Sequence, residues 1–238
     1  MNRKGLLVGD FAVSDDDVTV ARAYVEKIVA NYDVLANFEL SPVQSECKKK
    51  SVNLIAGKEV MYWLSMQPGL SFSLVNNHLE DGGQDFDALS FALKPSNTIH
   101  TPSSLIEPVK WGSNRLIFFG DAFEDVELSG PFNRFEKRAI DELELKDTIC
   151  IVHGGIEYRR FPTLRQRSLA HRLVDRGAKS VIFHHSHVEG VWENYCGRLI
   201  HYGLGNFLFS SIDGLHGIDF SQCPAIQVDH VTGDLIPG

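Results

Sequence analysis

The sequence predicts an α/β fold with a largely parallel sheet. Short apolar runs, typical of buried strands, alternate along most of the chain with segments whose apolar residues recur at helical spacing. Polar residues of the kinds that bind metal ions directly follow several of these runs, as expected at the carboxyl ends of parallel strands. Near the C-terminus strand-like runs follow one another without helices, so we expect antiparallel additions there.

Hydrophobic periodicity, together with Gly and Pro, places the elements in order. The predicted strands cover residues 5–8, 33–38, 51–55, 70–75, 115–119, 148–152, 180–183, 198–202, 206–209 and 225–228. The predicted helices cover residues 18–28, 58–66, 85–93, 132–143 and 164–176. Ser14 and Asp17 resemble an N-cap box before the first helix, and Gly177 is the expected stop of the last.

Composition excludes several classes of protein. The 238 residues, 43% of them hydrophobic, suffice for a sizeable core. No linker divides them, so we expect a single domain over residues 1–238. A net charge of −8 argues against a general binder of nucleic acid or anionic membranes. The cysteines form no zinc-binding spacing. No apolar run approaches a membrane span or a signal-peptide core, so we expect a cytoplasmic protein without membrane insertion.

Five short segments carry side chains suited to a metal site. They are Gly9-Asp10, Asn37-Phe38-Glu39, Asn76-Asn77-His78, His153-Gly154-Gly155 and His184-His185-Ser186-His187. Four of them follow predicted strands. Carboxylate, amide and imidazole ligands together suit a hydrolytic site with two metal ions. One such segment would mean little, but five in this order predict a metallohydrolase.

Each ligand-type residue can be given a role in a site where two ions activate a shared water. We expect Asp10 and His187 to bind the first ion and Glu39 to bridge the two. The expected ligands of the second ion are Asn77, His153 and His185. These oxygen and nitrogen ligands, without thiolate, predict two divalent ions of Mn, Fe or Zn and disfavour copper.

Other side chains near these ligands have separate expectations. His78 follows a predicted ligand directly and is placed to protonate a leaving group. In an extended segment His185 and His187 would share one face, so His184 should point away and serve a structural role. Arg159 and Arg160 could bind an anionic substrate, although a solvated loop surface accounts for them equally well.

The order of these segments and their residue sequences resemble the poly-γ-glutamate capsule synthesis (CapA) family of the calcineurin-like metallophosphoesterase superfamily. Residues 151–158 (Ile-Val-His-Gly-Gly-Ile-Glu-Tyr) are similar to the family's His-Trp-Gly-x-Glu-Tyr. Residues 183–188 (Phe-His-His-Ser-His-Val) are similar to its Gly-His-His-Pro-His-Val, and residues 202–207 (Tyr-Gly-Leu-Gly-Asn-Phe) to its Tyr-Ser-Leu-Gly-Asn-Phe. With the upstream segments the resemblance extends from Leu6 to Phe209.

The resemblance implies a metallophosphoesterase-like four-layer α/β/β/α sandwich with a dinuclear site at one edge of its two sheets. It also implies a place in bacterial capsule, poly-γ-glutamate or polysaccharide biosynthesis. Three positions depart from the family pattern. Ala12 stands where the superfamily often has the His of Asp-x-His, Gly154 replaces Trp, and Phe183 replaces Gly.

The leading functional hypothesis is a metal-dependent hydrolase of a phosphoester or related bond in an anionic small molecule or polymer. One alternative is a non-catalytic component of a capsule synthesis complex that binds an acidic polymer. Another is a metal-dependent amide hydrolase or transferase acting on a poly-γ-glutamate-like chain. The enzyme is favoured because a chain without metal chemistry need not keep all these ligand-type residues together.

Overall fold

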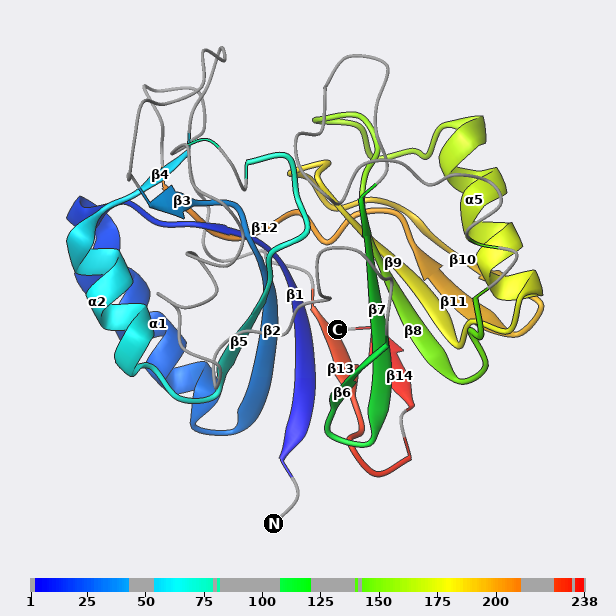
Figure 1. Cartoon of the computed structure of the whole chain (residues 1–238), viewed down its shortest axis with the longest axis horizontal. Coiled ribbons are helices and arrows are strands. Elements are labelled where there is room, and N and C mark those ends of the chain that lie inside the picture. Colours follow the sequence, from blue (N-terminus) through cyan, green and yellow to red (C-terminus); the bar gives the residue numbers. More distant parts are fainter. Residues whose placement is uncertain are drawn as a thin grey trace.

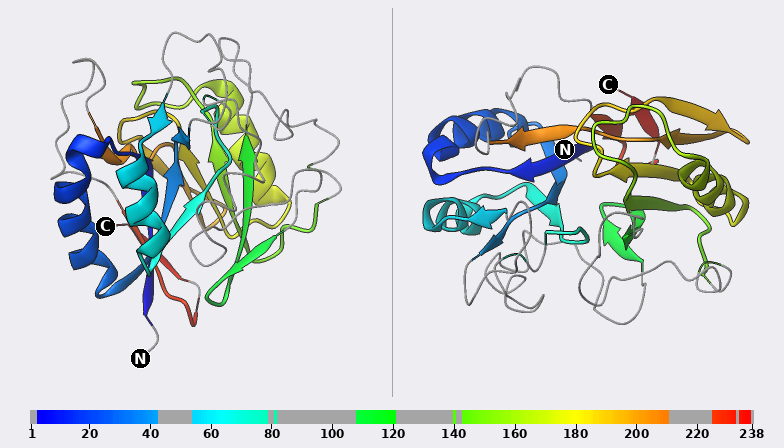
Figure 2. Two further views of the ribbon diagram at one scale, coloured as in Figure 1. Left: turned by 60° about the vertical axis from the view of Figure 1, so that its left-hand side comes forward. Right: turned by 90° about the horizontal axis from the view of Figure 1, so that it is seen from above.

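Two mixed β-sheets lie face to face, with helices on the outer face of each (Figure 1). The computed structural model describes residues 3–42, 54–78, 81, 108–120, 140, 143–210, 225–232 and 234–237. Seen from above, the sheets form two adjoining layers between α1 and α2 on one side and α5 on the other (Figure 2).

The first sheet is built around β1 (Lys4–Ala12). β2 (Tyr32–Phe38) runs parallel to one edge of β1, and β5 (Leu70–Ser73) runs parallel to β2. The other edge is shared by β13 (Ile226–Val228), which is antiparallel to the start of β1, and β12 (Asn206–Phe209), which is parallel to its end. β14 (Leu235–Pro237) pairs antiparallel with β13.

The second sheet has the order β10-β11-β9-β8-β7-β6. Its strands are β6 (Val109–Trp111), β7 (Asn114–Gly120), β8 (Thr148–His153), β9 (Ser180–His184), β10 (Trp192–Tyr195) and β11 (Arg198–His201). The central four are mutually parallel, whereas β6 and β10 at the edges are antiparallel to their neighbours. A separate parallel pair joins β3 (Ser41–Pro42) to β4 (Ile55–Ala56).

An apolar layer joins the inner faces of the two sheets. Leu7 and Leu35 of the first sheet belong to the same buried cluster as Phe118, Ile151 and Ile182 of the second. Every residue of β8 and of β9 is buried, as expected for parallel strands covered on both faces. The inner layer therefore fixes the two sheets against each other.

Helices cover the outer face of each sheet. α1 (Val18–Val29) buries Ala21, Val25 and Val29, which are spaced four residues apart and so line one stripe. With α2 (Lys58–Met66) it packs on the first sheet, where Phe38 and Phe72 are buried. α5 (Leu164–Asp175) covers the second sheet. The predicted four-layer α/β/β/α sandwich is confirmed.

Several local predictions need correction. Ser14 does not cap α1: it precedes a 3-10 turn (η1, Asp15–Asp17), makes no side-chain cap, and its hydroxyl donates to the Asp17 carboxylate. The capping box lies instead at α5, between Thr163 and Gln166. The edge strands β6, β10 and β14 and the short β3 were not predicted. In β10 the side chains are exposed or half-buried, so it gives little hydrophobic signal.

Other predictions fall partly or wholly outside the described residues. The helix at 85–93 and the residues 51–53 of a predicted strand lie outside them, although that strand's end meets β4 at Ile55. Of the helix at 132–143 only residues 140 and 143 are described. No helix within the described ranges is long and apolar enough to cross a membrane.

Candidate metal centre

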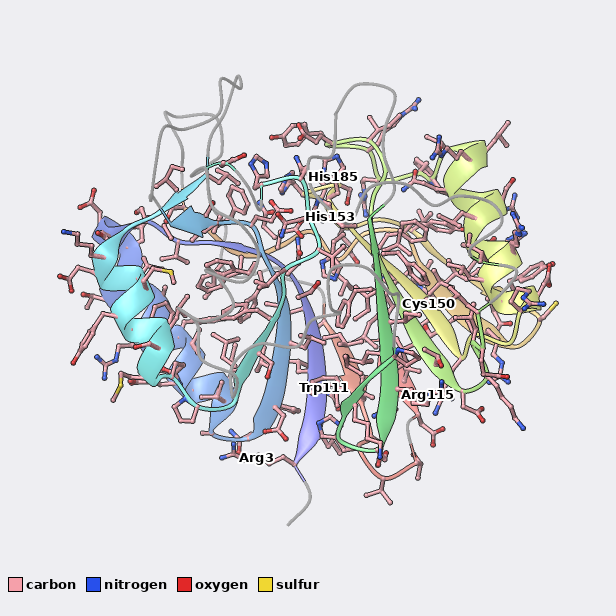
Figure 3. All side chains as sticks on the ribbon, viewed as in Figure 1. Arg3, Trp111, Arg115, Cys150, His153 and His185 are labelled. Carbon is pink, nitrogen blue, oxygen red and sulfur yellow. The ribbon has the colours of Figure 1, made fainter. Side chains whose placement is uncertain are left out.

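The ligand-type side chains meet at one end of the sandwich, where strands of both sheets end. Asp10 pairs in register with Asn37 across β1 and β2, and His153 pairs with His184 across β8 and β9. His153 and His185 lie together between the sheets, far from the end that carries Arg3 and Trp111 (Figure 3). The sheet register thus brings together residues from distant parts of the chain.

Gly9 allows the chain to close tightly around Asp10. A Cβ at Gly9 would lie 1.9 Å from the backbone oxygen of Gly205, which accepts a hydrogen bond from the Asp10 N–H at 2.9 Å. Only glycine permits this approach. The same loop delivers Asn206, whose Oδ1 is 2.9 Å from Nδ1 of His187.

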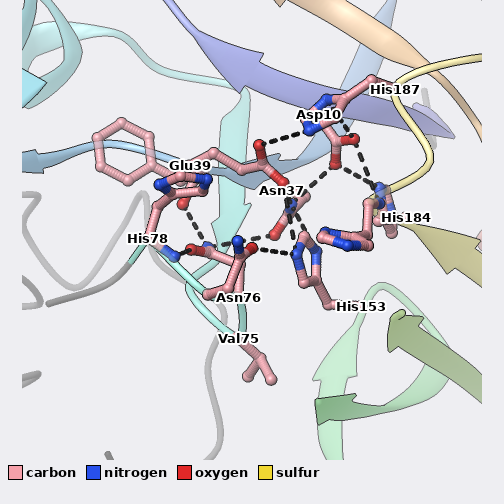
Figure 4. A network of polar contacts seen from close by, with 12 residues as sticks. Asp10, Asn37, Glu39, Val75, Asn76, His78, His153, His184 and His187 are labelled. Atoms are coloured by element: carbon pink, nitrogen blue, oxygen red, sulfur yellow. Dashed lines mark hydrogen bonds and ion pairs between the residues drawn. The ribbon is translucent and has the colours of Figure 1, made fainter. Parts of the chain in front are cut away.

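Asp10, Glu39 and His153 form a fully buried cluster, which we call the inner group. Their side chains are 0%, 0% and 2% exposed, and one ligand atom from each lies within 4.8 Å of the others. The amide nitrogen of Asn37 is 2.8 Å from Asp10 Oδ1, 3.0 Å from Glu39 Oε1 and 3.2 Å from His153 Nδ1 (Figure 4). Asn37 therefore holds the three ligand-type side chains in place.

The segment after β5 supplies the next residues. Asn77 Oδ1 lies 2.8 Å from Nε2 of His153. His78, 8% exposed, has its Nδ1 2.6 Å from Oδ2 of Asp81, which also accepts the backbone N–H of Leu54. Asp81 thereby fixes the orientation of the His78 ring and leaves Nε2 directed away from the dyad.

The histidine segment reaches the centre by a route that differs from the prediction. β9 ends at His184, and both His185 and His187 have left-handed backbone, with φ of 87° and 55°. Alternation along an extended strand is therefore the wrong explanation for their convergence. His184 also does not point away: its Nδ1 lies 3.3 Å from Asp10 Oδ1.

Glu157, His185 and His187 form a second cluster, which we call the outer group. One ligand atom from each lies within 4.8 Å of the others. Glu157 is exposed on the loop after β8, His185 is buried, and His187 is half-buried. The two groups adjoin each other. The His185 ring packs edge-on against His153, with ring centroids 4.8 Å apart. His187 Nε2 lies 3.7 Å from Glu39 Oε2, and His187 Nδ1 lies 3.4 Å from Asp10 Oδ2. The assignment of ligands to the first and second ion stays a prediction.

The electrostatics of the inner group are set by burial. Burial and the charges of Asp10 and Glu157 raise the pKa of Glu39 well above its usual value. Burial also raises the pKa of Asp10, but the nearby imidazoles of His184 and His187 outweigh it, so that the net pKa is lowered. Two adjoining buried carboxylates thus share one small volume.

The imidazoles are held in the form that binds metal. Burial, with His185 nearby, lowers the pKa of His153 well below its usual value. Burial and the charge of His187 lower the pKa of His185 to about 3. Both rings are neutral at neutral pH, as metal ligands must be.

The residues present fit a bound cation. Glu39 Oε2 is buried and has no hydrogen-bond donor among the described residues, and it lies 3.7 Å from His187 Nε2. Nδ1 of His187 lies 2.9 Å from Asn206 Oδ1, so Nε2 is the ring nitrogen that faces Glu39. A buried carboxyl oxygen without a hydrogen-bond partner costs free energy, and a cation between this oxygen and the ring would satisfy it.

Two arginines were expected to bind substrate. Arg160 Nε donates to the backbone oxygen of Glu189 at 3.1 Å, and its guanidinium is 4.0 Å from the Glu189 carboxylate. Arg159 is exposed on the same loop. Their role in binding a substrate stays a prediction.

Sequence reasoning missed Glu157, Asn37 and His184. Glu157 lies in the segment that resembles the family's His-Trp-Gly-x-Glu-Tyr, and Asn37 lies two residues before Glu39, but neither position carries a local signal for its role. His184 was misplaced because its segment was treated as extended. Ala12, at the position of a superfamily His, is buried and offers no ligand atom.

Comparison with known proteins supports this picture. Residues 133–211 match the family described as "Bacterial capsule synthesis protein PGA_cap". The chain is 47% identical over 72 residues to the PGA biosynthesis protein CapA of Bacillus subtilis (strain 168), and 44% identical over 57 residues to the capsule biosynthesis protein CapA of Bacillus anthracis. These matches cover 29% and 24% of this chain but only 19% and 14% of the relatives.

Solved structures share the fold at low sequence identity. A phosphatase from Mycoplasma pneumoniae superposes with a TM-score of 0.54 at 13% identity, over 99% of this chain and 92% of that one. A second solved structure has the same TM-score at 12% identity, over 100% and 99%. The blocks around Asp10, Glu39 and Asn77 precede the part matched by the family model. The match over residues 133–211 confirms the expected resemblance to the family described as "Bacterial capsule synthesis protein PGA_cap" for this part of the chain.

Proposed function

We propose that this chain is a metal-dependent hydrolase of phosphoester bonds that acts on an anionic substrate in capsule polymer production. The observation that carries the proposal is the buried convergence of Asp10, Glu39 and His153 beside His187. Glu39 Oε2 faces His187 Nε2 and has no hydrogen-bond donor within the described part of the chain. A purely structural cluster would leave this oxygen unsatisfied at a cost in free energy, whereas a cation site uses it.

The chain's own atoms define where cations would bind. Asp10, Glu39 and His153, with Asn77 Oδ1 adjacent, would hold one ion, and His185 with His187 would hold a second. Bound there, divalent ions would act as Lewis acids that favour ionisation of water and neutralise charge on a phosphoryl group. Asn37 and Asn206 orient the ligands from outside, as such partners do in metal sites.

His78 is the proposed proton donor. Its Nδ1 is engaged by Asp81 at 2.6 Å, so Nε2 is the nitrogen that can give a proton to a leaving oxygen. The ring is close enough to His185 to influence that residue's pKa, which places it beside the outer group. Arg159, exposed nearby, is the better placed of the two arginines to bind an anion, because Arg160 is engaged by Glu189.

The relatives' names motivate the polymer context. The family model that matches residues 133–211, the stretch with His153, His185 and His187, is described as a capsule synthesis protein, and two relatives are named for PGA and capsule biosynthesis. Because a solved structure with the same fold is called a phosphatase, a phosphoester is the first bond whose hydrolysis should be tested.

The test combines elemental analysis with turnover of p-nitrophenyl phosphate in added Mn²⁺. We expect bound metal and measurable hydrolysis. In His78→Ala we expect kcat to fall about 100-fold, the lower range of general acid–base catalysis, while metal content is unchanged. His171→Ala is the matched control and should keep its kcat, because this histidine of α5 packs on Tyr195 and contacts Glu193 of β10 instead of the metal centre.

Other outcomes decide against the proposal. A protein that binds no divalent metal would contradict it outright. Bound metal without turnover of esters would favour the polymer-binding component, and turnover only of a γ-glutamyl amide would favour the amide hydrolase or transferase.

A further inference from the structure

The loop between β8 and α5 exposes apolar side chains beside the metal centre. Ile156, Tyr158 and Phe161 are 40%, 52% and 71% exposed, and the mechanism above uses none of them. We infer that Tyr158 is a substrate-binding residue whose ring contacts an apolar group attached to the phosphoryl group. The substrate class is then phosphoesters whose alcohol carries an aromatic ring or a comparable apolar surface. The inference rests on the proposed function and names the substrate class of the same site.

The backbone of this loop is fixed to the histidine segment. The N–H of Tyr158 donates to the backbone oxygen of Ser186 at 2.7 Å, and that of Gly154 donates to the backbone oxygen of His184 at 3.2 Å. Gln166 of α5 donates its side-chain amide to the Gly154 oxygen at 3.2 Å. Tyr158 is therefore held against the segment that carries the ligand-type histidines.

The backbone of Tyr158 is strained. Its φ of 60° lies in the left-handed region, which costs free energy for a residue with a bulky side chain. Glycine would adopt the same torsion without that cost. The large ring at this position therefore points to a role for the side chain itself.

The Tyr158 ring lies beside His187. Their ring centroids are 6.2 Å apart, and the two planes are tilted by 35°. His187 Nε2 in turn lies 3.7 Å from Glu39 Oε2, the buried oxygen that a cation would satisfy. A phosphoryl group bound at this position would have the exposed tyrosine ring as its neighbour.

The hydroxyl of Tyr158 stays neutral. Burial, together with the charges of Glu157 and Glu39, raises the pKa of this phenol above its ordinary value. At neutral pH the side chain therefore carries no charge that would repel an anionic substrate. Because the charge of Glu39 acts on the phenol, the ring lies within electrostatic reach of the inner group.

The ordinary interpretation is that Tyr158 is one of the apolar side chains that every protein surface exposes. Such residues are usually scattered, whereas a concentration of them marks a binding surface. Within the described part of the chain, four of the ten exposed large apolar side chains fall in residues 156–164: Ile156, Tyr158, Phe161 and Leu164. The N–H of Val191 donates to the backbone oxygen of Arg160 at 2.9 Å, which brings the segment with the exposed Trp192 alongside this loop.

Charge and apolar surface adjoin each other at this end of the molecule. Arg159, which follows Tyr158 directly, is exposed and suits the anionic part of a substrate. The tyrosine ring suits an apolar part, because contact between the two removes both surfaces from water. A small polar alcohol would leave the ring solvated and gain nothing from it.

The test compares two phosphonates that differ only in their organic group. Phenylphosphonate carries a ring and methylphosphonate does not, and calorimetry with Mn²⁺-loaded protein measures the Kd of each. In wild type, phenylphosphonate should bind about 10-fold more tightly, as expected when part of an aromatic ring leaves water. Tyr158→Asn should abolish that preference, and asparagine tolerates the left-handed backbone. Tyr158→Phe, which keeps the ring, should retain the preference.

Tyr62→Ala is the matched control, because Tyr62 of α2 is an exposed tyrosine outside this loop. It should keep the wild-type preference, and circular dichroism and Mn²⁺ affinity should be unchanged in all three variants. The inference is overturned if wild type lacks the preference, if Tyr158→Asn keeps it, or if Tyr158→Phe loses it. Hydrolysis of p-nitrophenyl phosphate by wild type would then leave the proposed function standing. Wild type that binds no divalent metal would overturn both.

Discussion

The inner and outer groups place similar ligand atoms with different parts of the fold. Asp10 and His153 belong to β1 and β8, and Glu39 follows β2 directly, so the inner group is positioned by the sheets themselves. Glu157, His185 and His187 lie on loops, two of them with left-handed backbone. Paired strands give the inner group a rigid frame, and strained loops give the outer group access to solvent.

The same comparison predicts where a cation stabilises the protein. The inner carboxylates are fully buried, and burial together with neighbouring charge raises the pKa of Glu39. Without a cation this cluster opposes folding, and with one it supports folding. The exposed Glu157 has no such effect, because water can solvate it.

Glu39→Gln should cause the largest change in the stabilisation that a bound cation gives to the fold. In wild type, Mn²⁺ at a thousandfold excess over its Kd should stabilise the fold by about 4 kcal/mol. We expect the variant to lose most of that stabilisation because the inner ion loses its carboxylate. Thermal unfolding with and without Mn²⁺ measures it.

The metal-free variant provides the internal control. A carboxyl whose pKa is raised on folding contributes stability at low pH that is lost as pH rises through the folded pKa. Metal-free Glu39→Gln should therefore unfold at the same temperature as wild type or higher at pH 8. If Mn²⁺ stabilised the variant as much as wild type, Glu39 would not be a ligand.

Asn37→Ala should have the next largest effect. Its amide nitrogen contacts Asp10, Glu39 and His153 together, so its loss leaves buried acceptors without this donor. We expect a loss of about 2 to 3 kcal/mol in the free energy of unfolding, measured in urea without metal. Asn194→Ala, whose side chain accepts one turn N–H at the edge of β10, should lose less. Equal losses would mean that Asn37 is only another local hydrogen-bonding residue.

The smallest expected effect is the contribution of His201 to the pH dependence of stability. Burial, with His184 nearby, lowers its pKa from 6.5 to about 4. Between these values the unfolded chain binds a proton that the folded chain does not, so stability falls as pH drops below 6.5. From pH 7 to pH 5 this residue should cost up to about 2 kcal/mol.

Comparison with His201→Gln isolates that contribution. The variant's melting temperature, measured without metal, should fall less steeply from pH 7 to pH 5 than that of wild type. Above pH 7 the two profiles should run parallel. A steeper fall in the variant would show that His201 is protonated in the folded protein.

The inner group was predictable from sequence, because strand ends obey a simple rule. Apolar runs placed β1, β2 and β8 to within one to a few residues, and parallel strands bring their carboxyl ends to one edge. Once the strands were placed, Asp10 and Glu39 were expected at one edge of the first sheet, and the two-sheet sandwich that the resemblance implies brings His153 of the second sheet to the same edge. The same logic located Asn77 and His78 after β5.

The outer group was only partly predictable, because backbone torsions in loops leave no periodic signal. Nothing in the spacing of His185 and His187 indicates positive φ. The two side chains were expected on one face because side chains alternate along a strand, but this segment is not extended. Glu157 is exposed and is placed by hydrogen bonds between loops, such as that from Tyr158 to Ser186. Contacts of this kind depend on tertiary structure and cannot be inferred from local pattern.

Anomalous diffraction at the manganese edge, from crystals grown with Mn²⁺, tests the central claim most directly. We expect one peak coordinated by Asp10, Glu39 and His153 and a second about 3.5 to 4 Å away beside His187, the separation usual for two-metal hydrolases. An anomalous map without density at this edge of the sheets, at saturating Mn²⁺, would contradict the account.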